Sequence, residues 1–122
     1  MRALLARTLR NCGFEVVEAG SGYETVERLA QAFHIRPWLG LDLVISDVRM
    51  PGYDGLNVLA SLRQLPASIP VILITAFPTA ATQATAARLG AFALLEKPFD
   101  LDDLVLLARS ATGPQLADQD QS

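Results

Sequence analysis

Strand-like and helix-like segments alternate along this chain, and the alternation constrains its fold more than any other feature. Three short apolar runs, at 43–47, 70–75 and 92–96, have the length and composition of buried strands. The segment 14–19 (FEVVEA) is also rich in β-branched residues and is predicted to be a strand. Apolar residues at helical spacing predict helices over 2–12, 21–33, 55–64, 79–89 and 101–111. This order predicts an α/β fold: a parallel sheet with helices on both faces.

Length and composition limit the possible functions. The chain has 122 residues, which suits one domain with one core. Its net charge of −3 gives no basic surface for nucleic acid or anionic lipid, so we expect no direct contact with nucleic acid. No apolar run approaches the ~20 residues that span a bilayer, so we expect no membrane insertion. With one cysteine, Cys12, and therefore no disulfide framework, we expect a cytoplasmic protein.

Three of the predicted strands lead directly into reactive side chains. The run 43–47 ends in Asp47, the run 70–75 ends in Thr75, and Lys97 follows the run 92–96. Ligands of open α/β sheets bind outside the carboxyl ends of the strands, so these side chains are expected at one edge. A carboxylate can form an aspartyl-phosphate, a hydroxyl can donate to a phosphoryl oxygen, and a lysine can neutralise phosphoryl charge. Each has ordinary structural roles too, but the three together favour a phosphoryl-binding site.

Four segments carry motifs that are specific in combination. They are GFEVVEAGSGYETV (13–26), LDLVISDVRMPGYDG (41–55), IPVILITA (69–76) and LGAFALLEKPFD (89–100). Together they resemble the receiver domain of bacterial two-component response regulators. The resemblance implies a flavodoxin-like, doubly wound (βα)5 fold over residues 1–111, with 112–122 as a polar C-terminal tail.

The resemblance also implies roles for individual residues. Asp47 would be the phosphoacceptor, supplied by a histidine kinase or a histidine phosphotransfer protein, and the chain would be a signalling switch rather than an enzyme. Thr75 would bind a phosphoryl oxygen and act in the switch, and Lys97 would pair with the phosphoryl group. Asp47 and the backbone carbonyl of Arg49 would bind Mg²⁺. The bond between Lys97 and Pro98 would be cis, an isomer that has a low energetic cost only before proline.

The sequence departs from the family at its beginning. Receivers begin with a strand that ends in two adjacent acids, which hold Mg²⁺, whereas this sequence begins at the helix that follows. No other acid replaces the pair. Asp42 would lie ~16 Å from Asp47 along the same strand, Asp54 is placed to cap the helix at 55, and acids near 100 begin the last helix. We therefore predict weak or absent binding of Mg²⁺ and weak or absent phosphorylation of this chain.

The missing first strand leaves several alternatives. One alternative is that the strands predicted at 14–19 and 43–47 pair directly with each other. A second is that another copy of the chain fills the gap in a homodimer. A third is that Met1 is an internal methionine of a longer protein. The last is favoured because the helix beginning at Met1 has no N-cap residue. The alternative function is a degenerate or truncated receiver that binds proteins without phosphorylation. A phosphatase or dehalogenase is disfavoured because Arg49 stands where a second acid is expected.

Overall fold

A computed structural model describes residues 2–16, 24, 27, 42–49, 54–64 and 69–113. Its helices and strands follow one another as α1 (Arg2–Asn11), β1 (Val44–Asp47), α3 (Gly55–Leu62), β2 (Val71–Thr75), α4 (Ala80–Arg88), β3 (Ala93–Glu96) and α5 (Leu101–Thr112). Each predicted helix or strand in these ranges is present, with ends shifted by only one or two residues.

Two predicted segments fall largely outside the described residues. Of the strand expected over 14–19, residues 14–16 lie in neither helix nor strand, and 17–19 are outside the description. Of the helix expected over 21–33, only Glu24 and Glu27 are described, and both are helical. The part of the predicted tail beyond residue 113 also lies outside the described residues.

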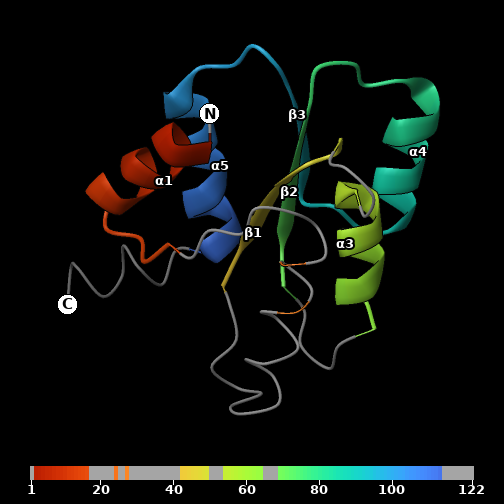
Figure 1. The fold of residues 1–122 in the computed structure, drawn as a ribbon, viewed down its shortest axis with the longest axis horizontal. Helices are drawn as coiled ribbons and strands as arrows, with labels where there is room; N and C mark the ends of the chain where they lie inside the picture. Colours follow the sequence, from red (N-terminus) through yellow and green to blue (C-terminus); the bar gives the residue numbers. More distant parts are fainter. Residues whose placement is uncertain are drawn as a thin grey trace.

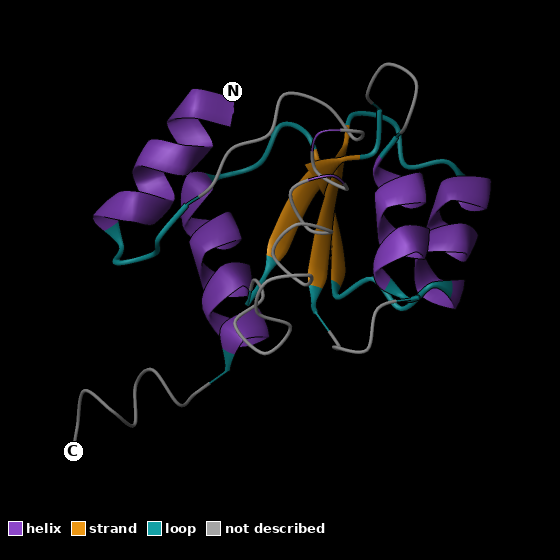
Figure 2. Cartoon of the chain, turned by 60° about the horizontal axis from the view of Figure 1, so that its bottom comes forward, coloured by secondary structure: helices purple, strands orange, loops and turns teal. Residues whose placement is uncertain are grey.

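The described strands form a parallel sheet in the order β1-β2-β3. α1 and α5 cover one face of this sheet, and α3 and α4 cover the other, as both views show (Figures 1 and 2). The expected flavodoxin-like α/β architecture is thus confirmed. None of the helices within the described ranges is long and apolar enough to cross a membrane.

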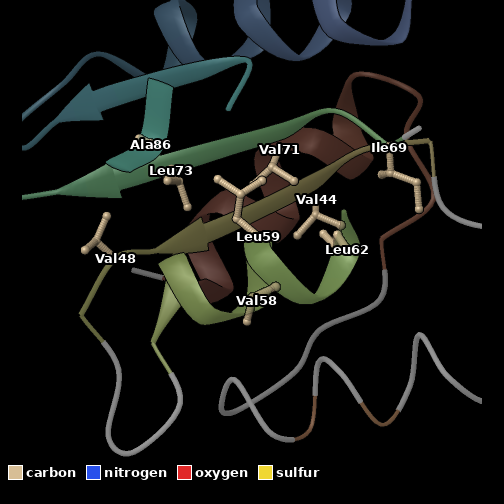
Figure 3. Close-up of a cluster of buried hydrophobic side chains, with 9 residues drawn as sticks. All are labelled: Val44, Val48, Val58, Leu59, Leu62, Ile69, Val71, Leu73 and Ala86. Carbon is tan, nitrogen blue, oxygen red and sulfur yellow. The ribbon is translucent and has the colours of Figure 1, made fainter. Parts of the chain in front are cut away.

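The centre of the core is β2, whose five residues are all buried. Val71 and Leu73 face α3 and pack with its buried side chains in a cluster that Figure 3 shows. The cluster comprises Val44, Val48, Val58, Leu59, Leu62, Ile69, Val71, Leu73 and Ala86. Because side chains alternate along a strand, Ile72 and Ile74 point to the opposite face, toward α1 and α5. The nearly continuous apolar run 70–75 is therefore explained by burial on both faces.

A glycine marks the end of α1. Gly13 has a φ of +96°, a conformation that glycine adopts readily. The Phe14 N–H donates to the Leu9 carbonyl at 3.0 Å, and the Gly13 N–H donates to Arg10 at 3.1 Å, which is the Schellman pattern. The buried face of α1 is centred on Ala6 and Leu9, while Cys12 is half-buried.

Candidate phosphoryl-acceptor site

The register of the sheet brings the ends of the strands to one edge. Asp47 pairs with Ile74, and Thr75 pairs with Glu96, the residue before Lys97. The pairing continues one residue past two strands, because the Val48 N–H donates to the Ile74 carbonyl and the Lys97 N–H donates to the Thr75 carbonyl, each at 2.8 Å. The backbones that carry Asp47, Thr75 and Lys97 are therefore fixed next to one another.

Asp47 and Lys97 are in direct contact. The Lys97 Nζ lies 2.8 Å from the Asp47 Oδ1, although the two residues are 50 positions apart in the sequence. The side chain of Lys97 is 33% exposed and that of Asp47 is 40% exposed, so the ion pair lies at the surface of the protein. The Oδ1 atom itself is buried and receives no hydrogen bond of good geometry from any described residue, although the Lys97 ammonium lies close to it. The exposure of Asp47 comes from its other atoms.

Thr75 lies at the same edge but makes a different contact. It is only 3% exposed, and its Oγ1 accepts a hydrogen bond from the Phe77 N–H at 3.2 Å. Phe77, by contrast, is 68% exposed. The Thr75 hydroxyl is therefore tied to the loop that leads into α4. We did not predict this contact, because a threonine two residues before a phenylalanine is not a recognisable sequence motif for such a hydrogen bond.

The loop that follows Asp47 is closed by the start of α3. Asp54 caps this helix as predicted: its Oδ1 accepts from the Asn57 N–H at 2.9 Å, and the Asn57 Oδ1 accepts from the Asp54 N–H at 3.1 Å. The Gly55 N–H donates to the Val48 carbonyl at 2.9 Å. Asp54 is thus engaged at the helix terminus and is not presented to the Asp47 carboxylate as a second acid.

Gly55 packs directly on the backbone that carries Asp47. A Cβ added to Gly55 would overlap the Asp47 carbonyl oxygen and would lie 2.9 Å from the Asp47 carbonyl carbon and 3.0 Å from the Val48 Cα. The same Asp47 carbonyl accepts a hydrogen bond from the Ser46 Oγ at 3.0 Å. Gly55 therefore helps to set the position of the Asp47 backbone. In the sequence, the Asp54-Gly55 pair is the signal that identifies this glycine.

The loop between β3 and α5 also borders the site. The peptide bond between Lys97 and Pro98 is cis. A pocket of about 510 Å³ opens beside this loop, between Leu4 and Leu5 of α1 and the residues around Pro98. Apart from Lys97, the residues that line it are apolar. The described part of the pocket lining therefore provides one cation and an apolar surface.

The described side chains near Asp47 do not offer the several oxygen ligands that Mg²⁺ prefers. Within the described ranges, no three acidic, histidine or cysteine side chains gather as a metal site would require. Asp47 supplies one carboxylate, and Lys97 already neutralises its Oδ1. The exposed Arg49 follows Asp47 by two residues, and its carbonyl as a metal ligand stays a prediction. The described residues by themselves therefore do not complete a magnesium site.

The described residues thus form a small α/β domain of the doubly wound type, with an aspartate–lysine ion pair at the carboxyl edge of its parallel sheet. Comparison with known proteins identifies the family: the model of the response regulator receiver domain matches residues 1–109. This chain belongs to that family, and it is a receiver domain of the two-component response regulators.

Individual relatives support the assignment. The chain is 36% identical over 111 residues to the DNA-binding transcriptional regulator NtrC of Escherichia coli K12; the match covers 91% of this chain and 22% of NtrC. The receiver domain of NtrX from Brucella abortus has a TM-score of 0.73 and 30% identity, covering 89% of this chain and 87% of that one. A chain of the CheX–CheY–BeF3–Mg²⁺ complex from Borrelia burgdorferi has a TM-score of 0.76 at 23% identity, covering 88% and 78%, and is similar in fold.

Proposed function

We propose that this chain accepts a phosphoryl group on Asp47 from a histidine kinase or a histidine phosphotransfer protein and thereby switches a protein-binding surface. The observation that carries the proposal is the contact between Lys97 and Asp47 at the carboxyl edge of the sheet, 2.8 Å between Nζ and Oδ1. It supports the proposal because a carboxylate nucleophile beside a fixed ammonium suits the transfer of an anionic group.

The proposed reaction is a transfer between two side chains. A carboxylate oxygen of Asp47 forms a bond to phosphorus, the bond from phosphorus to the imidazole nitrogen of the partner breaks, and the electron pair of that bond stays with the imidazole. Lys97 offsets the negative charge that gathers on the phosphoryl oxygens. The Thr75 hydroxyl can donate to one of these oxygens after it turns from its present contact with the Phe77 N–H. Lys97 and Thr75 thus bind and orient the group that Asp47 receives.

The place of Mg²⁺ in this chain is restricted. The Borrelia burgdorferi complex, which contains BeF3 and Mg²⁺, includes a chain of the same fold. In the present chain Asp47 and the Arg49 carbonyl would be the ligands, but one carboxylate that is already paired with Lys97 is a poor site for a hard dication. We infer weak binding of Mg²⁺ and a low level of phosphorylation, and no step of the transfer above is assigned to the metal.

The small number of metal ligands among the described residues favours one alternative function. A receiver that lacks ligands for the metal can act as an interaction module that binds its partners irrespective of phosphorylation. The described residues hold no cluster of three potential metal ligands, and this supports the alternative. The two functions differ in one respect that can be measured, namely whether Asp47 gains a phosphoryl group.

The wider setting of the domain is also part of the proposal. The receiver unit spans 1–111 and the tail 112–122, and the unit functions in the cytoplasm as a signalling module, not as an enzyme. Its partners are histidine kinases or histidine phosphotransfer proteins, or a second copy of itself in a homodimer, and it makes no direct contact with nucleic acid or membrane. Because the match covers only 22% of NtrC, the DNA binding in that protein's name is not assigned to this chain.

The intact mass of the chain after incubation with acetyl phosphate, with and without Mg²⁺, tests the proposal. We expect a small fraction of the protein to gain the mass of one phosphoryl group, with little dependence on Mg²⁺. The isosteric variant Asp47→Asn should gain none. A gain in the asparagine variant would refute Asp47 as the acceptor, and the absence of any gain in the wild type would leave the interaction module as the function.

A further inference from the structure

Arg63 fastens α3 to the far end of α4. It is the C-cap residue of α3, and its guanidinium donates three hydrogen bonds to backbone carbonyls: Nε to Leu89 at 2.7 Å, Nη1 to Ile69 at 3.1 Å, and Nη2 to Gly90 at 3.0 Å. Leu89 is itself the C-cap residue of α4, and Gly90 follows it with a φ of +76°. One side chain therefore joins the ends of two helices that lie side by side over the same face of the sheet (Figures 1 and 2).

The burial of α4 is concentrated at this same end. Ala86 is the buried residue of the helix, and Leu89 and Ala91, just beyond it, pack partly buried against the core cluster. The first six residues, 80–85, include none that is buried. An alanine- and threonine-rich first half offers little apolar area to hold it against the sheet. α4 is therefore anchored at its C-terminal end and weakly held at its N-terminal end.

The weakly held end is connected to Thr75. The Phe77 N–H donates to the Thr75 Oγ1, and the Phe77 carbonyl accepts from the Thr79 N–H at 2.9 Å. Thr79 is the N-cap residue of α4, and its Oγ1 accepts from the Thr82 N–H at 3.1 Å. A continuous series of hydrogen bonds thus runs from the hydroxyl at the site to the first turn of α4. A rotation of the Thr75 side chain would break the first hydrogen bond of this series, the one between the Phe77 N–H and the Thr75 Oγ1.

We propose that Arg63 is a positioning residue that makes the C-terminal end of α4 a pivot, so that a change at Thr75 moves the N-terminal half of the helix alone. The three guanidinium hydrogen bonds of Arg63 and the burial around Ala86 hold residues 86–91 in place. The loop 76–79 transmits the orientation of the Thr75 hydroxyl to residues 80–85. Without Arg63, the same change at Thr75 loosens the whole helix. The proposal rests on the proposed function only for the identity of the event that turns Thr75.

Amide hydrogen exchange, measured by NMR on the full chain without any phosphoryl donor, tests the pivot. The Gln83 N–H, bonded to Thr79, reports on the first half of α4; the Leu89 and Ala91 amides, bonded to Thr85 and Ala86, report on the second. We expect Thr75→Val, which keeps the shape of the side chain but removes the hydroxyl, to speed exchange at Gln83 about three- to tenfold and to leave Leu89 and Ala91 unchanged.

The arginine variants complete the experiment. Arg63→Gln should speed exchange at Leu89 and Ala91 by at least about tenfold, because a charged donor is lost from carbonyls it had satisfied, while the amides of β2 stay protected. Arg63→Lys, which keeps the charge but loses the fork, should fall between. Arg88→Gln removes an exposed arginine of α4 and should change nothing. In the double variant Thr75→Val, Arg63→Gln, the effect of Thr75→Val should spread to Leu89 and Ala91.

The spread in the double variant separates a pivot from a merely structural contact. If Thr75→Val raises exchange equally at both ends of α4 while Arg63 is present, or if it leaves Leu89 and Ala91 unaffected when Arg63 is absent, the pivot does not exist. A rise at all amides, those of β2 included, would mean general unfolding and would also overturn it. Because no phosphoryl donor is used, a chain that fails to accept a phosphoryl group leaves this result standing.

Discussion

Gly55→Ala is expected to destabilise the domain by about 3 kcal/mol and to abolish phosphoryl acceptance, although it is the smallest change possible at that position. The added Cβ would overlap the Asp47 carbonyl oxygen and approach the Val48 Cα to 3.0 Å. Both neighbours are backbone atoms, so no side chain can turn aside to make room. Alanine is the better helix former by up to about 1 kcal/mol, and this opposes but does not cancel the overlap. Urea-induced unfolding and intact mass measure the two effects.

A second glycine provides the matched control. Gly13 has no heavy atom within 4 Å of a built Cβ, so Gly13→Ala adds the same methyl group without a collision. Its cost is that of placing alanine at a φ of +96°, about 1 kcal/mol, and phosphoryl acceptance should persist. Equal losses of stability in the two variants, or unchanged acceptance in Gly55→Ala, would show that Gly55 does not set the position of Asp47.

Lys97→Ala is expected to lower the initial rate of phosphoryl incorporation about 100-fold, which is the usual loss when one preorganised charge beside a developing anion is removed. The Lys97 Nζ lies 2.8 Å from the buried Asp47 Oδ1. Without it, incoming phosphoryl oxygens meet a carboxylate whose charge is not offset. The rate is measured with radiolabelled acetyl phosphate under conditions in which the wild type is labelled linearly with time.

Two further variants bound this effect. Lys97→Arg keeps the positive charge and should retain more of the rate than Lys97→Ala, though the wider guanidinium will not reproduce the 2.8 Å contact. Arg109→Ala removes an exposed cation on α5 and should leave the rate unchanged. If Arg109→Ala slows labelling as much as Lys97→Ala does, net charge rather than the Asp47–Lys97 pair governs acceptance.

Much of the fold follows from local patterns in the sequence. The run 70–75 is apolar up to Thr75 because β2 is buried on both faces, and Gly13 ends α1 because the chain turns there with a positive φ. Asp54 caps α3 through a contact three residues away, which lies within the reach of a sequence motif. Features that depend on residues close in sequence were therefore predicted, with bounds that differ by a residue or two.

The site was predicted only as far as topology determines it. A parallel sheet carries the carboxyl ends of its strands to one edge, so the meeting of Asp47 and Lys97 could be expected. The contacts of Arg63 with Leu89 and Gly90 span 26 and 27 residues and depend on how two helices pack, for which the sequence has no local signal. The turn of the Thr75 hydroxyl toward Phe77 is likewise a choice of side-chain rotamer that packing decides.

The most direct test of the central claim is to locate the phosphoryl group. An acyl phosphate on an aspartate is reduced by borohydride to homoserine, so the chain is treated with acetyl phosphate, reduced, digested and sequenced by tandem mass spectrometry. Our account predicts homoserine at position 47 in a fraction of the wild-type peptides and in none from a sample without acetyl phosphate. Homoserine at another acidic position, with Asp47 intact in every peptide, would contradict it.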